Sequence, residues 1–244
     1  MAGKGRPRMI LPLLLAGASV AVGAAILAAQ TEEPSRTDAK ARAHHEDKPG
    51  TALFDPAALE AVETVSVEGI AHLTVVLGEA PPSARAAHEE DLEIALRDEG
   101  RRLVIEGPDR HSLFGSDPVP RVRLHLARLS RIDVDGAGRI TLEGPVESLL
   151  LDIDGAAEAT LSGPRCGELT VRIDGAGAVD AAELPCEAVR IAVDGAGKVE
   201  AHASRSARVG LDGIGSITVH GRPAEVSVDK DGLGTVRFPD RPGI

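Results

Sequence analysis

An Asp-Gly dipeptide recurs at nearly constant spacing through the second half of this 244-residue chain. It occurs six times in this half, and successive aspartates lie 19, 20, 20, 18 and 19 residues apart. Internal repeats of about 20 residues are typical of solenoids, in which each copy forms a coil that stacks on the next. The six aspartates are Asp135, Asp154, Asp174, Asp194, Asp212 and Asp231.

Aliphatic residues alternate with polar ones on both sides of each Asp-Gly, as at Ile132, Val134, Ile140 and Leu142 of the first copy. Such alternation is typical of half-buried strands. One coil of two short strands cannot bury its own apolar side, whereas stacked coils bury it together. The sequence therefore predicts an all-β fold, a short single-stranded parallel β-helix (β-solenoid) with about 19 residues per coil. The crossover rule favours a right-handed coil, although the period also permits a left-handed one.

The repeated turn has two interpretations. In the favoured one, glycine adopts a positive φ and each aspartate caps its own turn by accepting backbone N–H groups. In the other, Ca²⁺ bridges the Asp135–Asp231 column, which would make this a cation-stabilised structural protein of the envelope. Ca²⁺ needs six to eight oxygens, and each corner offers one carboxylate. We therefore expect no metal site and no cofactor.

The two cysteines, Cys166 and Cys186, each lie eight residues before a repeat aspartate. They therefore occupy equivalent places in successive coils, where strands are ~4.8 Å apart. That separation suits a disulfide, which an oxidising compartment would preserve. The alternative is a pair of stacked free thiols that act as small hydrophobic residues.

The N-terminus carries Lys4, Arg6 and Arg8, followed by an uncharged run from Met9 to Ala29. This pattern predicts a signal peptide or N-terminal membrane anchor over residues 1–30, with the membrane contacted through residues 9–29. An uncleaved anchor is favoured, with later residues facing outward. Polar residues 31–52 predict a flexible linker, and residues 53–244 predict the β-helical domain, with repeats from 131.

Charge and composition exclude one class of partner. The formal net charge is −11, and the chain has three Phe, no Tyr and no Trp. A nucleic acid would be repelled, and no basic stripe interleaved with aromatic residues offsets this. We therefore expect no nucleic-acid binding, and a lectin-like site built on stacked aromatic rings is disfavoured.

One outward column offers a candidate catalytic constellation of Asp133, Asp152 and Arg172. A polysaccharide-acting β-helix enzyme would need convergent carboxylates, a basic partner and a cleft. An exposed cross-strand charge ladder explains the same three residues. No long loop interrupts residues 131–238 to wall off a cleft, so we expect no catalytic residues and no enzyme.

The motifs IDVDGAGRITLEG, VSVEG…VVLG and LVIEG resemble the head GIN domain, a bacterial family labelled as an auto-transporter adhesin. The resemblance covers roughly residues 60–240. The family usually has Ser or Asn in the turn where this chain repeats Asp. The resemblance implies an envelope-associated β-helical protein without enzymatic activity or cofactor, and it supplies no functional residues.

The expected function is that of a non-enzymatic, exported cell-envelope protein, an adhesin-like surface or protein-interaction module. Its expected partners are envelope or cell-surface proteins or polymers. Its expected location is periplasmic or extracellular, with the N-terminus anchored in the membrane. The alternatives are the polysaccharide-acting enzyme and the cation-stabilised structural protein described above.

Overall fold

The structure is a computed structural model, and it describes residues 51–87, 92–108 and 119–241. The predicted membrane segment, residues 9–29, and residues 31–50 of the predicted linker lie outside these ranges. Within them almost every element is a strand, and the α-helix α1 (Pro56–Leu59) is four residues long. No helix in the described part of the chain is long and apolar enough to cross a membrane.

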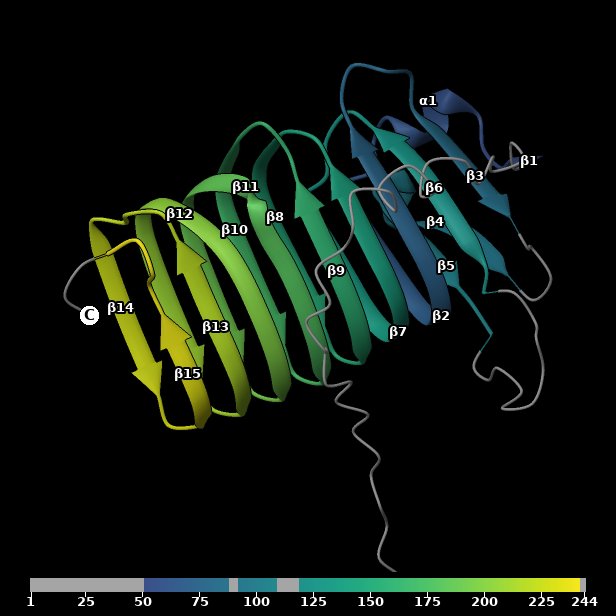
Figure 1. Cartoon of the computed structure of the whole chain (residues 1–244). Coiled ribbons are helices and arrows are strands. Elements are labelled where there is room, and N and C mark those ends of the chain that lie inside the picture. Colours follow the sequence, from purple (N-terminus) through teal and green to yellow (C-terminus); the bar gives the residue numbers. More distant parts are fainter. Residues whose placement is uncertain (1–50, 88–91, 109–118, 242–244) are drawn as a thin grey trace, which may run out of the picture. The chain divides into compact units, whose positions relative to one another are not determined.

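The fold is a β-solenoid of parallel coils, as predicted, and its strands lie side by side along the stack (Figure 1). Each coil from residue 131 onward contributes one strand stretch before its Asp-Gly and one after it. The strands are β7 (Arg131–Glu143), β8 (Val146–Ile153), β9 (Ala156–Ser162), β10 (Cys166–Ile173), β11 (Ala176–Val193), β12 (Ala196–Leu211), β13 (Ile214–His220), β14 (Glu225–Lys230) and β15 (Leu233–Arg237).

The register pairs equivalent residues of successive repeats, because each strand stacks on its counterpart in the next coil. The aliphatic residue three places before each aspartate shows this, since each one is the partner of its equivalent. The column runs Ile132, Leu151, Val171, Ile191, Val209 and Val228. The predicted inward columns are confirmed: in the first five copies all of their residues are buried.

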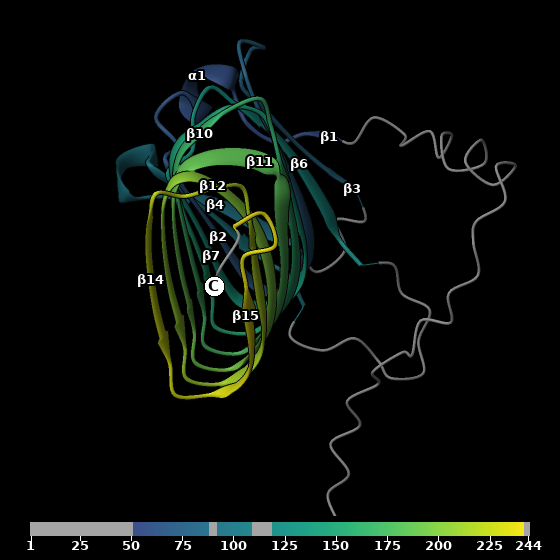
Figure 2. The same ribbon diagram turned by 60° about the vertical axis from the view of Figure 1, so that its left-hand side comes forward.

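Seen along the stack, each coil has two facing walls joined by turns, with β14 in one wall and β15 in the other (Figure 2). The aliphatic side chains fill the space between the walls and form one hydrophobic core. Val, Ile, Leu and Ala make up almost all of that core, and Phe238 is its aromatic member among the fully buried residues. Layers of such similar size can stack at a constant strand spacing.

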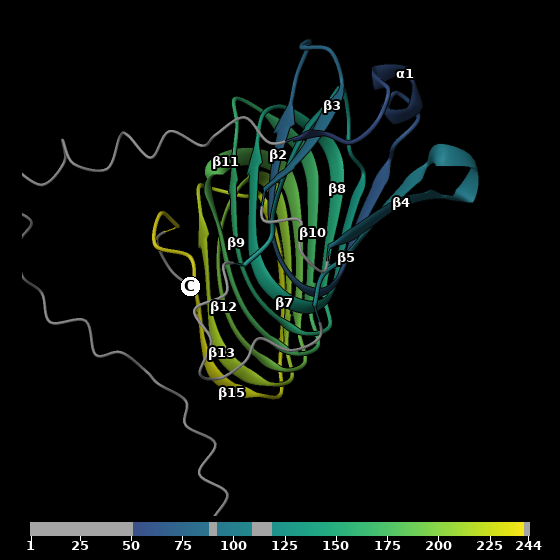
Figure 3. The same ribbon diagram turned by 90° about the vertical axis from the view of Figure 1, so that its right-hand side faces the viewer.

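The N-terminal end contains an additional copy of the repeat, β2 (Thr64–Leu77), which pairs with β7 along its length. Glu68 and Gly69 of β2 lie opposite Asp135 and Gly136, so Glu-Gly takes the place of Asp-Gly. Beyond β2, two later strands form the next layer, and antiparallel strands and α1 cover that end (Figure 3). These strands are β1 (Thr51–Ala52), β3 (Ser83–Ala87), β4 (Glu93–Arg97), β5 (Arg102–Glu106) and β6 (Arg121–Leu126).

A hairpin joins β4 to β5 through a 3₁₀ turn at Asp98–Gly100. Asp98 and Glu99 have φ of 53° and 59°, a left-handed conformation that non-glycine residues rarely adopt.

At the C-terminal end, β14 pairs only with β12 and β15 only with β13, so one edge of each strand is free of strand partners among the described residues. Val228 is 43% exposed and Lys230 is exposed, because no further coil covers them. Phe238 is 5% exposed and packs against the core. The core therefore ends on this ring rather than on β14.

Candidate binding surface on the solenoid

The outward side chains of each wall form columns that cross successive coils. We call one wall the β8 face: it consists of β8, β10 and β14 with Arg131–Val134, Ala188–Val193 and Ser206–Leu211. We call the other the β9 face: it consists of β9, β13 and β15 with Ala137–Glu143, Ala176–Ala181 and Ala196–His202.

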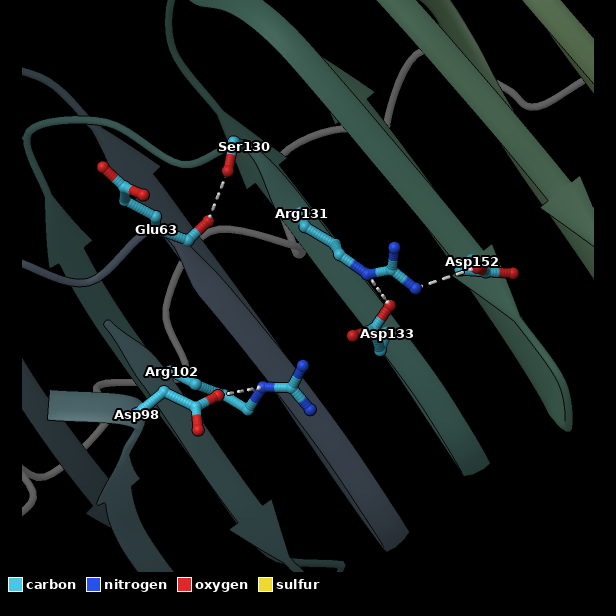
Figure 4. A network of polar contacts seen from close by, with 7 residues as sticks. All are labelled: Glu63, Asp98, Arg102, Ser130, Arg131, Asp133 and Asp152. Carbon is cyan, nitrogen blue, oxygen red and sulfur yellow. Dashed lines mark hydrogen bonds and ion pairs between the residues drawn. The ribbon is translucent and has the colours of Figure 1, made fainter. Parts of the chain in front are cut away.

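Asp133, Asp152 and Arg172 are register neighbours on the β8 face, as the sequence predicted. Arg131 lies beside them and joins the two carboxylates (Figure 4). Its Nε donates to Asp133 Oδ1, and one of its terminal nitrogens donates to Asp152 Oδ2 at 3.1 Å. Each aspartate is thus held in an ion pair on an open, part-exposed surface. The geometry matches the charge ladder rather than a pair of free acid and base groups.

Arg131 was not among the residues singled out from the sequence. Its place is the outward column two residues before the Asp133 column, which continues through Arg190 and Arg208 of later coils. Aligning these outward positions in the same way as the inward ones would have revealed the column. Inward columns are uniform and easy to detect, whereas an outward column changes its residue type from coil to coil.

The β9 face carries its own ion pairs. An Arg139 terminal nitrogen lies 2.8 Å from Glu158 Oε2, and Lys198 Nζ lies 2.8 Å from Glu200 Oε1. The hydrogen bond from Lys198 lowers the pKa of the Glu200 carboxyl, and the same bond raises the pKa of Lys198. These exposed pairs hold their charges in fixed positions but add little to stability.

The six repeat aspartates lie at one corner of successive coils and are all exposed. Among the described residues, the carboxylates that accept a hydrogen bond from a backbone N–H group are those of Asp55, Asp180 and Asp240. None of the six repeat aspartates is among these acceptors, so the structure shows no capping role for them. No group of three or more His, Cys, Asp or Glu in the described part of the chain is arranged to hold a metal ion.

The glycine that follows each repeat aspartate has a different role from the predicted one. None of these six glycines has a positive φ, so that part of the prediction was wrong. The constraint is the neighbouring coil: a Cβ built on Gly175 would lie 2.0 Å from the Gly155 carbonyl oxygen. A Cβ on Gly195 would lie 1.9 Å from the Gly175 oxygen. Glycine is required here because the backbones of successive coils approach too closely for any side chain.

Cys166 and Cys186 are register partners at the start of β10 and in β11, and both are buried. The structure joins them in a bond between coils, with Cα atoms 4.2 Å apart. The bond lies inside the stack and is not part of either exposed face.

The hollows in the described surface are shallow. One of about 440 Å³ lies near Glu63 and Arg102 at the N-terminal end, where Arg102 Nε is 3.2 Å from Asp98 Oδ2 (Figure 4). Another of about 330 Å³ lies on the β8 face and is lined by Arg172, Arg190 and Arg208. The surface thus offers rows of charged and hydroxyl groups rather than a deep cleft.

Comparison with one solved structure supports the same fold. The crystal structure of a "putative adhesin" from Bacteroides fragilis is 17% identical, with a TM-score of 0.58, and the match covers 74% of this chain and 94% of that one. A "putative lipid binding protein" and a "putative adhesin" from Parabacteroides distasonis match at 14% and 16% identity, with TM-scores of 0.37 and 0.33. The match covers 77% of this chain in both cases, and 95% and 94% of theirs.

No curated protein matches the chain. At these identities the Bacteroides fragilis structure shows a shared fold and nothing more. A family model, however, matches residues 63–223, which is more than half of the chain and includes β2 and five of the six Asp-Gly copies. The chain belongs to the family described as "Putative auto-transporter adhesin, head GIN domain".

Proposed function

We propose that this protein is a non-enzymatic, adhesin-like module of the cell envelope. An N-terminal segment at residues 9–29 anchors it in the membrane, and residues 31–52 tether the solenoid on the outer side. The basic residues before the apolar run support export with this orientation. The family's description as an adhesin, and that of the Bacteroides fragilis structure, support a surface role.

The observation that carries the proposal is the set of ordered outward columns on the β8 face. Neighbouring strands hold outward side chains ~4.8 Å apart over several coils, and charged residues recur among them. Such a surface is suited to an extended partner that makes many weak contacts, as solenoid proteins commonly do. Envelope or cell-surface polymers and proteins are partners of this kind.

Catalysis is less well supported by the same face. A glycosidase pairs two carboxyl groups, one of them acting as an acid, across a substrate cleft. Here both Asp133 and Asp152 accept hydrogen bonds from Arg131 on an open wall. We therefore assign binding, and not bond cleavage, to this surface.

An adhesion assay tests the proposal. The full chain is reconstituted in fluorescent vesicles of neutral lipid, which are passed over bacterial cell walls fixed to a flow cell. We expect retention that saturates with vesicle number and is competed away by the free protein. Retention no greater than that of protein-free vesicles would contradict an adhesin-like role. Release of new reducing sugar ends from the cell walls would instead favour an enzyme.

A further inference from the structure

The hollow on the β8 face arises from two small residues. The outward column of Asp133, Asp152 and Arg172 continues with Ala192 and then Gly210. Charged side chains therefore give way to a methyl group and a hydrogen atom on two successive coils. Both residues line the hollow of about 330 Å³.

Three arginines from three successive coils line this hollow: Arg172, Arg190 and Arg208. Arg190 forms an ion pair with Glu168. Arg172 and Arg208 form no ion pair with any described residue. Asp152, the register neighbour of Arg172, accepts its hydrogen bond from Arg131 instead.

The charges around the hollow are unbalanced even though the whole chain is acidic. The residues that line the hollow include three arginines and one acidic residue, Asp229. Like charges on neighbouring strands repel by roughly 1 kcal/mol per pair in water. An anion that binds between them removes this repulsion, and a guanidinium can hold a carboxylate through two parallel hydrogen bonds.

We propose that this hollow binds the carboxylate groups of an acidic polysaccharide, with Arg172, Arg190 and Arg208 as its contacts. The proposal rests on the adhesin-like function and names the class of ligand for it. Arg190 and Arg208 are register partners on strands ~4.8 Å apart, and Arg172 lies on the preceding strand, two residues along from their column. The hydroxyl groups of Thr170 and Ser227 also line the hollow and can bond to sugar hydroxyls.

Two other polyanions fit this surface less well. An extended acidic peptide commonly binds by adding a strand to a sheet edge. The main chains of β10, β11 and β12 around the hollow are already paired on both sides. The free edge of β14, which also lines the hollow, is the edge opposite β12 and therefore faces away from the three arginines. Single-stranded nucleic acid is bound by stacking bases on aromatic rings, and no aromatic residue lines the hollow.

The test uses a hexamer of galacturonic acid, titrated calorimetrically into the full chain in neutral detergent at low salt. The same hexamer with its carboxyl groups methyl-esterified is the matched ligand, because it keeps the sugar and loses the charge. We expect the acid to bind at least tenfold more tightly than the ester, and the affinity to fall as salt is added. Equal binding of the two, or no binding of the acid, would overturn the proposal. Hexaglutamate that binds as tightly as the acid would overturn it in favour of acidic peptides.

Paired variants locate the site. Replacing both Arg172→Ala and Arg208→Ala should weaken binding of the acid at least tenfold. The control, Arg139→Ala with Arg205→Ala, removes the same charge from exposed ion pairs outside the hollow. It should change the affinity for the acid less than twofold. An equal loss in both variants would show an effect of net charge alone and overturn the site.

Failure of the proposed ligand class can be distinguished from failure of the adhesin-like role. If wild-type vesicles adhere and the Arg172→Ala, Arg208→Ala variant adheres equally well, the ligand class is wrong and the adhesin-like role stands. If the hexamer binds in the hollow but vesicles do not adhere, the site stands and the adhesin-like role fails.

Discussion

At the scale of single residues, the corner of the repeat shows how one sequence signal can have an unexpected cause. The Asp-Gly dipeptide located six coils, yet its glycine is not needed for a positive φ, and its aspartate accepts no hydrogen bond from a backbone N–H group of the described residues. Glycine is needed because the carbonyl of the preceding coil occupies the space of a Cβ. The aspartates remain as an exposed column of like charges.

The glycine column leads to the first prediction. Gly175→Ala should lower the free energy of unfolding by about 2–3 kcal/mol, because the new Cβ would overlap the Gly155 oxygen and force the coils apart. Urea denaturation of the purified chain measures this. Gly78→Ala is the control, since nothing lies within 4 Å of its Cβ position, and it should change stability by less than about 0.5 kcal/mol. Equal stabilities of the two variants would contradict the close-approach explanation.

The aspartate column leads to the second prediction. Asp174→Asn keeps the shape of the side chain and removes its repulsion from Asp154 and Asp194, which lie ~5 Å away along the stack. We expect the melting temperature to rise by about 2 °C at low salt and to match the wild type in 1 M NaCl, where charges are screened. Glu183→Gln, outside the column, should give no such rise. A fall in the Asp174→Asn melting temperature would instead show that the carboxylate has a structural bond.

At the scale of elements, the two ends of the stack differ from its middle. Strands β7 to β13 have partners on both sides, so their aliphatic residues are covered by the coils before and after them. The N-terminal end is closed by β5 and β6, which follow β2 in the chain and pair in parallel with its outer edge, and by the antiparallel β3 and β4 beyond them. The C-terminal end is closed mainly by Phe238, while β14 and β15 keep free edges within the described residues.

We expect the C-terminal coil to protect the end of the stack, and its removal tests this. A chain that ends at residue 226 lacks most of β14, all of β15 and Phe238. It would expose Val209, Leu211, Ile217 and Val219, which are now buried, on an unpaired edge. We expect this truncation to aggregate, because long apolar edges pair with one another. Size-exclusion chromatography with light scattering gives the answer, and a soluble monomer would count against it.

The link between β10 and β11 leads to the fourth prediction. The exported protein should show no free thiol in a native or a denatured thiol assay, because Cys166 and Cys186 are bonded across neighbouring coils. Cys166→Ala with Cys186→Ala should lower the free energy of unfolding by about 3 kcal/mol, since the bond closes a loop of 20 residues. Two titratable thiols in the exported protein would refute the bond.

At the scale of the whole molecule, the stack is one hydrophobic core shared by every coil, and it forms a single compact unit within residues 47–244. No inserted loop of the described residues between β7 and β15 interrupts it. Stability therefore depends on the contacts between neighbouring coils, as in other solenoids. The Asp column runs along the same stack, so an ion that bridged its carboxylates would raise the stability of the whole unit.

The last prediction concerns such an ion. Melting in excess EDTA and in millimolar Ca²⁺ should give midpoints within about two degrees, because each corner offers one carboxylate and Ca²⁺ needs six to eight oxygens. Calorimetry of the full chain in detergent measures both midpoints. A rise of ten degrees or more with Ca²⁺ would make the Asp column a metal site. Mg²⁺ at the same concentration controls for general screening of the charges.

The sequence by itself determined the solenoid, its period and its inward residues, because a strand alternates its side chains at every second residue and the repeat makes equivalent residues neighbours. It also placed Asp133, Asp152 and Arg172 in one column, since register follows from the repeat. Only the tertiary structure decided that Glu68–Gly69 forms the corner of an additional coil, that Arg131 bonds both aspartates, and that three arginines line a hollow. Those outcomes depend on which outward side chains meet across coils, and outward positions follow no shared pattern because solvent accepts any polar residue there.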